Sequence, residues 1–108
     1  MQLDIPYHLE NFIGGNFIGP LSGKFIDDIN PATGTVFAQI PNSNERDIDI
    51  AVQAAKKVQA FWAAGSLENR FLILHKIADL IDENAEALAE AETKDNGKPL
   101  WLSRKVDI

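Results

Sequence analysis

The two histidines are the first candidates for chemistry, because imidazole is the side chain whose charge changes near neutral pH. His8 and His75 are far apart in the sequence, and neither has metal-ligand residues at a regular spacing or a carboxylate partner at a fixed offset. His75 borders an apolar helical stripe, so a packing or capping role is favoured. The histidines therefore do not predict a shared metal or acid–base site.

The carboxylates between positions 79 and 92 recur at helical spacing, away from the apolar stripe. They are Asp79, Asp82, Glu83, Glu86, Glu90 and Glu92. This pattern favours a solvated helix face over a pair of carboxylates for acid–base catalysis. The chain has no cysteine, which excludes a disulfide, a thiolate metal site and a cysteine nucleophile within these residues. Gly14-Gly15 is not a phosphate loop, because it lacks both the GxGxxG spacing and a following helix.

The composition is that of one small soluble domain: 108 residues, 45% hydrophobic and 24% charged, with a formal net charge of −6. An acidic chain argues against nucleic acid and anionic membranes as partners, since both attract basic patches. The first residues show no signal-peptide pattern, and the longest apolar run is far shorter than the roughly 18 residues of a membrane span. We expect a cytoplasmic protein.

The elements that must position any site are dominated by an amphipathic helical run from Ser66 to Thr93. Its stripe alternates steps of four and three through Leu67, Phe71, Leu74, Ala78, Ile81, Ala85 and Leu88. Ser66 is a suitable N-cap, Gly97 followed by Pro99 is a suitable stop, and a break near Glu83-Asn84 remains open. The stripe predicts a helix that buries a wide face.

A second helix precedes this one and should pack against it. Asn44 and Asp47 have capping-box spacing, and the apolar face continues from there to about Ala64. Because Gly65-Ser66 is so short a connection, we expect an antiparallel helical pair.

The first forty residues predict two small β-hairpins. Residues 1–10 are expected to form a loose lead-in, and residues 11–41 the hairpins, turning at Gly14-Gly15 and at Asn30-Pro31-Ala32-Thr33-Gly34. Residues 43–97 form the helices, and residues 99–108 begin a further helix that has no end signal. The predicted fold is α/β, with hairpins that need the helices as a base.

Four of these motifs in register resemble the N-terminal part of the aldehyde dehydrogenase superfamily. They are Phe12-Ile13-Gly14-Gly15-Asn16-Phe17, Ile29-Asn30-Pro31-Ala32-Thr33-Gly34, the Ala51–Trp62 helix, and Glu92-Thr93-Lys94-Asp95-Asn96-Gly97-Lys98-Pro99. Within the superfamily, three shorter stretches look most like the branch acting on hydroxymuconic or aminomuconic semialdehydes. They are Leu9-Glu10-Asn11-Phe12-Ile13, Ile40-Pro41-Asn42-Ser43 and Ser103-Arg104-Lys105-Val106-Asp107-Ile108.

The resemblance implies an NAD(P)-dependent oxidation of an aldehyde to a carboxylic acid and a homo-oligomeric parent enzyme. In the family a cysteine attacks the aldehyde, hydride passes to nicotinamide, and a glutamate activates water. The parts that bind cofactor and carry out catalysis belong to later family segments, so no catalytic or cofactor-binding residue is assigned here. We expect this chain to be an N-terminal segment of the NAD-binding domain that is inactive alone. The rival hypothesis is a small acidic helical interaction module.

The resemblance also implies one metal site, for a structural potassium or sodium ion. Its ligands in this sequence would be the backbone carbonyls of Asp28 and Ile29 and the carboxylate of Asp95, with a further family ligand beyond residue 108. Oxygen ligands suit a hard cation. The alternative for Asp95 is a hydrogen bond to backbone groups where its helix ends.

Overall fold

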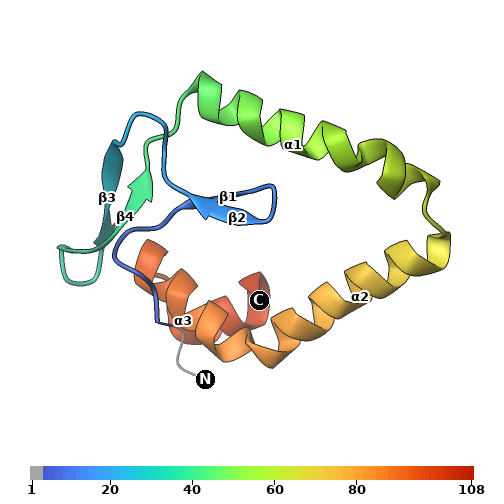
Figure 1. Ribbon diagram of the computed structural model, residues 1–108. Helices are drawn as coiled ribbons and strands as arrows, with labels where there is room; N and C mark the ends of the chain where they lie inside the picture. The colour runs from blue at the N-terminus through green and yellow to red at the C-terminus, as the bar shows by residue number, and fades with distance from the viewer. Residues whose placement is uncertain (1–3) are drawn as a thin grey trace.

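The computed structural model describes residues 4–108 and has the expected mixed α/β architecture, with two β-hairpins followed by helices. Figure 1 shows an open arrangement with two arms. Helix α1 (Glu45–Ala64) forms one arm, and α2 (Leu67–Glu83) with α3 (Ala85–Asn96) forms the other. The first hairpin lies between the arms, and the second lies at the end opposite the α1–α2 junction.

The first hairpin pairs β1 (Asn11–Ile13) with β2 (Asn16–Ile18) in antiparallel register. Its two-residue turn has φ of 60° at Gly14 and 83° at Gly15, the values that a primed turn requires. The hairpin contacts α1, and a Cβ added at Gly14 would lie 4.0 Å from the Ala54 Cβ. There is room for a Cβ beside the helix, so the positive φ of the turn, and not a close approach to α1, is what favours glycine at position 14.

The second hairpin pairs β3 (Phe25–Asn30) with β4 (Thr35–Pro41). The Asn30 Oδ1 accepts the Ala32 N–H at 2.9 Å, and Gly34 has φ of 70°, which confirms the predicted turn. The register shifts between Asp28 and Ile29, because Asp28 pairs with Ala38 and Ile29 with Val36. Phe37 is the extra residue of this bulge.

The lead-in is more ordered than expected near its end. Tyr7 and Leu9 bond Gln39 of β4 through N–O distances of 2.6 and 2.9 Å, so His8 forms a short parallel bridge with that strand. The outer edge of β4 supplies the free backbone groups that make this pairing favourable. Residues 1–3 of the predicted lead-in lie outside the described residues.

Helix α1 begins with the predicted capping box. The Asn44 side chain accepts the Arg46 N–H at 3.0 Å, and the Asp47 Oδ2 accepts the Asn44 N–H at 2.9 Å. The other Asp47 oxygen accepts the Leu21 N–H at 2.9 Å, which ties the segment after β2 to the start of α1. These two backbone hydrogen bonds lower the pKa of Asp47 below its usual value.

The long helical run divides into α2 and α3 at Asn84, so the break near Glu83-Asn84 is real. Asn84 has φ of −111° and ψ of 12°, and its Nδ2 donates to the Leu80 carbonyl at 2.8 Å. Gly97, with φ of 76°, ends α3 as predicted. The chain then forms α4 (Leu100–Leu102) and a π-helical turn, η1 (Ser103–Asp107), where the sequence predicted one further helix.

The predicted antiparallel pairing of the two long helices is wrong: α1 and α2 diverge from their junction and do not pack along their lengths. Arg70 explains the geometry. Its guanidinium donates to the carbonyls of Trp62, Ala63 and Gly65 at 3.3, 3.2 and 2.8 Å, which caps the end of α1 and fixes the elbow.

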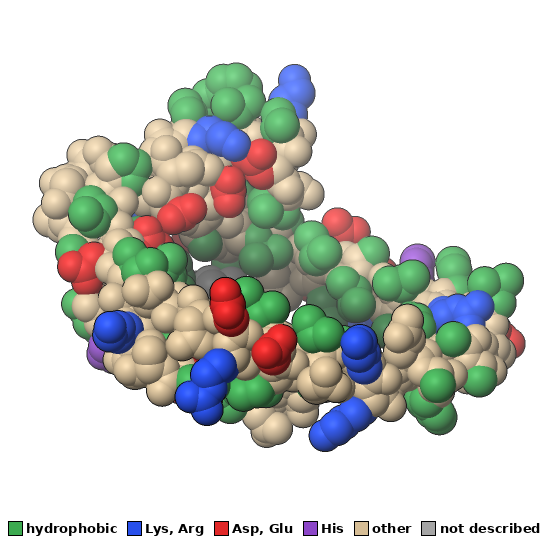
Figure 2. All heavy atoms as spheres, turned by 90° about the horizontal axis from the view of Figure 1, so that it is seen from above, with side chains coloured by type: hydrophobic (Ala, Val, Ile, Leu, Met, Phe, Trp, Pro, Cys, Tyr) green, Lys and Arg blue, Asp and Glu red, His purple; other side chains and the backbone are tan. Residues whose placement is uncertain are grey.

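The buried apolar residues of the described chain are only Ala38, Ala87 and Ala89. Helix α2 contributes none, and many large apolar side chains remain exposed on both arms. In Figure 2, hydrophobic side chains crowd the surface of the arm at the right of the view, where α1 and α2 meet. The apolar faces that the sequence predicts are therefore present but uncovered.

Candidate functional site

The three residues of the predicted cation site lie where β3 meets the end of α3, two elements that contact each other. Asp28 and Ile29 lie on β3 opposite the bulge that Phe37 makes in β4, and Asp95 is near the C-terminal end of α3. The structure therefore brings together Asp28 and Asp95, which are 67 positions apart in sequence.

The Asp28 side chain, rather than only its backbone, faces Asp95. Burial raises the pKa of the Asp28 carboxyl above its usual value, and the charge of Asp95 and a hydrogen bond to its side chain raise it further. Two carboxyl groups in contact repel each other when both are ionised, unless a proton or cation lies between them. The sequence assigned only the backbone carbonyl of Asp28 to the site and missed its side chain.

Asn96, and not Asp95, caps the end of α3, which was the alternative role for Asp95. The Asn96 Oδ1 accepts the Lys98 N–H at 2.8 Å, and the Asn96 Nδ2 donates to Glu92 at 2.6 Å. Asp95 accepts no backbone N–H among the hydrogen bonds of residues 4–108.

Two contacts hold the end of α3 against the β3–β4 hairpin. The Lys94 ammonium lies 4.9 Å from the centre of the Phe37 ring, so the bulged residue makes a cation–π contact. Gly97 lies against the Pro31 ring, where an added Cβ would be 2.8 Å from the Pro31 Cγ. These contacts fix the position of Asp95 relative to Asp28.

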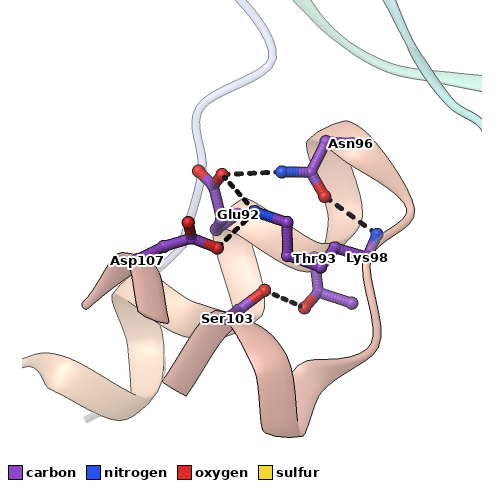
Figure 3. A network of polar contacts seen from close by, with 6 residues as sticks. All are labelled: Glu92, Thr93, Asn96, Lys98, Ser103 and Asp107. Atoms are coloured by element: carbon purple, nitrogen blue, oxygen red, sulfur yellow. Dashed lines mark hydrogen bonds and ion pairs between the residues drawn. The ribbon is translucent and has the colours of Figure 1, made fainter. Parts of the chain in front are cut away.

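A polar network fastens η1 to α3 on the other side of the same helix end (Figure 3). The fully buried Ser103 hydroxyl lies 2.9 Å from that of Thr93, and the Lys98 ammonium contacts both Glu92 and Asp107. Nearby, the Arg104 guanidinium binds both oxygens of Glu86, which lowers the pKa of Glu86 and raises that of Arg104. The network is satisfied internally, and its role is to hold the chain after Gly97.

The histidines do not meet. His8 contacts the rings of Tyr7 and Phe25, and His75 stacks on Phe71 while its Nε2 lies 3.9 Å from the Asp79 carboxylate. Helical spacing could have predicted this partner, because Asp79 stands at the i+4 position from His75. The pair lies on an exposed helix surface and lines no enclosed site.

The described residues contain no cluster of three or more histidine, cysteine, aspartate or glutamate side chains suited to a metal ion. Within residues 4–108, no helix combines the length and hydrophobicity needed to cross a membrane. The oxygen donors at Asp28, Ile29 and Asp95 suit a monovalent hard cation but are too few for a complete shell.

Comparison with known proteins identifies the family of this chain. Residues 17–108 match the model of the aldehyde dehydrogenase family. The chain belongs to this family of oxidoreductases. It is 42% identical over 106 residues to aldehyde dehydrogenase B of Escherichia coli, an alignment covering 98% of this chain and 21% of the relative. It is 43% identical over 100 residues to the 2-aminomuconic semialdehyde dehydrogenase of Mus musculus, covering 93% of this chain and 20% of that enzyme.

The fold of this aldehyde dehydrogenase chain is also shared with solved structures. PnpE in complex with nicotinamide adenine dinucleotide aligns with a TM-score of 0.89 and 34% identity, over 93% of this chain and 20% of PnpE. The NAD⁺ complex of an aldehyde dehydrogenase from Bacillus cereus aligns with a TM-score of 0.86 and 38% identity, over 93% of this chain and 21% of that one. The chain spans about one fifth of the length of these relatives.

Proposed function

We propose that this chain is the N-terminal part of the NAD(P)-binding domain of an enzyme that oxidises an aldehyde to a carboxylic acid. The observation that carries the proposal is the alignment of nearly the whole chain with both a curated aldehyde dehydrogenase and an NAD-bound structure. The uncovered apolar faces of α1 and α2 support it, because such faces are stable only against further protein. Exposed apolar faces would also suit the rival interaction module, so the alignment with aldehyde dehydrogenases is what favours the enzyme segment.

The 108 residues alone are expected to be catalytically inactive. The chain has no cysteine to act as the nucleophile, and its described residues converge on no enclosed acid–base site. We therefore assign NAD(P) binding and catalysis to the rest of the parent enzyme, which we propose to be a cytoplasmic homo-oligomer.

A covalent chimera tests the proposed function. In it, this chain replaces the matching segment of E. coli aldehyde dehydrogenase B, the relative that aligns over 98% of the chain. With NAD⁺ or NADP⁺ and an aldehyde, the chimera should form the reduced cofactor, whereas the isolated chain should form none above a protein-free control. A folded chimera without activity would reject the proposal.

We further propose a muconic semialdehyde as the substrate of the parent. The support is the likeness of the three short stretches that begin at Leu9, Ile40 and Ser103 to this branch, together with the identity of 43% to the 2-aminomuconic semialdehyde dehydrogenases of Mus musculus and Homo sapiens. The identity alone does not select this substrate, because the chain is 44% identical to a long-chain-aldehyde dehydrogenase of Acinetobacter sp.. The catalytic efficiency of a parent-derived enzyme on such a semialdehyde should exceed that on simple aliphatic aldehydes. The reverse ranking would reject this substrate while leaving the family activity intact.

The cation site is proposed for potassium or sodium, held by the carbonyls of Asp28 and Ile29 and the carboxylate of Asp95. The facing carboxyl groups of Asp28 and Asp95 fit this assignment, because a cation would neutralise their mutual repulsion. The ion would fix the β3–α3 junction and take no part in the reaction.

Replacing the cation tests this site. The chimera should melt at a higher temperature in potassium chloride than in choline chloride at equal ionic strength, and Asp95→Asn should reduce that difference. Equal melting temperatures in the two salts would reject the site, as would an unchanged difference in the variant.

A further inference from the structure

Helix α2 has an apolar surface that extends over about half of its circumference. At the 100° per residue of an α-helix, seven large apolar side chains lie within this half of the circumference: Leu67, Phe71, Ile73, Leu74, Ile77, Leu80 and Ile81. Ala78 lies among them, and so does Arg70, whose guanidinium reaches back to the end of α1. The opposite side carries Glu68, His75, Lys76 and Asp79, with Leu72 as its one large apolar residue.

The chain leaves this arc uncovered. Helix α2 has no buried residue, all seven side chains of the arc are exposed, and the main packing contacts of α2 are with the adjoining α3. An isolated helix of 17 residues is only marginally stable in water. The arc therefore needs an occupant if α2 is to remain helical.

The backbone already has the geometry of a covered helix. The chain matches PnpE with a TM-score of 0.89 although it spans only 20% of that protein. Arg70 fixes the angle between α1 and α2 through three carbonyl groups, and the contacts of η1 fix the far end of α3. A surface held in its bound shape loses less conformational entropy on binding.

We propose that the α2 arc docks the remaining four fifths of an aldehyde dehydrogenase subunit, and that it does so even when the two parts are separate polypeptides. This inference rests on the proposed function, because it takes the occupant from the same family. The sequence lengths favour this occupant over a second copy, since the missing part is about four times as long as this chain.

Co-expression tests the docking. The 108-residue chain carries an affinity tag, and its partner is E. coli aldehyde dehydrogenase B shortened by the segment that the chain matches. We expect a complex with equal amounts of the two polypeptides in size-exclusion chromatography.

Two leucines give a matched pair of variants. Leu74 lies in the arc and is 60% exposed, whereas Leu72 lies on the polar side and is 54% exposed. Because burying an unpaired carboxylate is unfavourable, Leu74→Asp should reduce the captured partner about tenfold or more, and Leu72→Asp should not. Leu74→Gln, which adds no charge, should also weaken capture, and the circular dichroism of all three chains should agree.

The outcomes separate this inference from the proposed function. An active covalent chimera with no complex between separate polypeptides would reject the docking alone. A complex that depends on Leu74, together with a folded but inactive chimera, would support the docking and reject the function. Equal losses in Leu72→Asp and Leu74→Asp would overturn the docking surface, and so would a chain that elutes as a homodimer dependent on Leu74.

Discussion

Gly97 shows how a single residue connects the two halves of the chain. Its φ of 76° ends α3, and its α-carbon lies so close to the Pro31 ring that an added Cβ would be 2.8 Å from the Pro31 Cγ. Gly34 has a similar φ of 70°, but a Cβ there would have no atom within 4 Å. The two glycines therefore separate the cost of backbone strain from that of a steric clash.

The expected order of stability follows from this difference. In the chimera, Gly34→Ala should cost about 1 kcal/mol through its left-handed backbone, and Gly97→Ala roughly 2–3 kcal/mol because the clash adds to the same strain. The fall in melting temperature relative to the unmodified chimera measures both. Equal losses for the two variants would mean that the Pro31 contact relaxes at no cost.

Asp28 and Asp47 contribute to folding stability with opposite dependence on pH. The folded-state pKa of Asp28 is raised above the usual 3.8, so the folded state binds this proton more tightly than the unfolded state. In potassium-free buffer this group therefore adds stability as the pH falls through the raised pKa towards about 3.8. For Asp47, whose pKa is lowered, stability is present above the usual pKa and lost as the pH falls through the folded value.

The variant Asp95→Asn tests the pH dependence of stability predicted for Asp28. The variant removes the charge that contributes to the raised pKa of Asp28, although the larger effect of burial remains. The melting temperature of the variant minus that of the unmodified chimera should be greatest near neutral pH and decrease on acidification to about pH 4. A difference that is constant over this range would contradict the proximity of the two carboxyl groups.

At the scale of residues, local chemistry could be predicted and long-range contacts could not. The capping residues Asn44, Asp47 and Ser66 and the stop at Gly97 all act as the sequence indicated, because each works within a few residues of its own position. The Asp28 carboxyl was missed because its environment depends on a β-bulge and on a helix far along the chain.

At the scale of elements, the elbow between α1 and α2 depends on Arg70. Its three hydrogen bonds to carbonyl groups cap a helix that has no basic residue in its own last turn. In the chimera, Arg70→Ala should cost roughly 1–3 kcal/mol and Arg70→Lys less, since a lysine retains the charge but cannot bond all three carbonyls in the same geometry. Melting temperatures that rank lysine below alanine would contradict this role.

The sequence predicted the helices themselves but not how they are arranged. Periodicity and the capping residues locate both helices, whereas the short Gly65-Ser66 connection predicts an antiparallel packing that the structure does not have. A short connection permits that packing without requiring it, and the Arg70 cap selects an open angle instead. The sequence alone does not decide the break at Asn84, because the apolar stripe continues in phase across it.

At the scale of the whole molecule, the chain has more helices and strands than its small hydrophobic core can stabilise. Three alanines are its only buried apolar residues within 4–108, yet its backbone agrees closely with that of proteins five times as long. Hydrophobic burial normally supplies the main stabilisation of such elements, so most of it must come from the remainder of the fold. The small core and the close backbone match both fit the proposal that the chain is one layer of a larger dehydrogenase subunit.

Aldehyde-dependent reduction of NAD⁺ or NADP⁺ by the covalent chimera tests that claim most directly. With the cofactor that unmodified E. coli aldehyde dehydrogenase B uses, the chimera should form the reduced cofactor at a rate within about tenfold of that enzyme, since the exchanged segment contributes packing and no catalytic group. Omitting the aldehyde provides the control. A soluble, folded chimera that forms no more reduced cofactor than this control, with either cofactor, would contradict the proposed function.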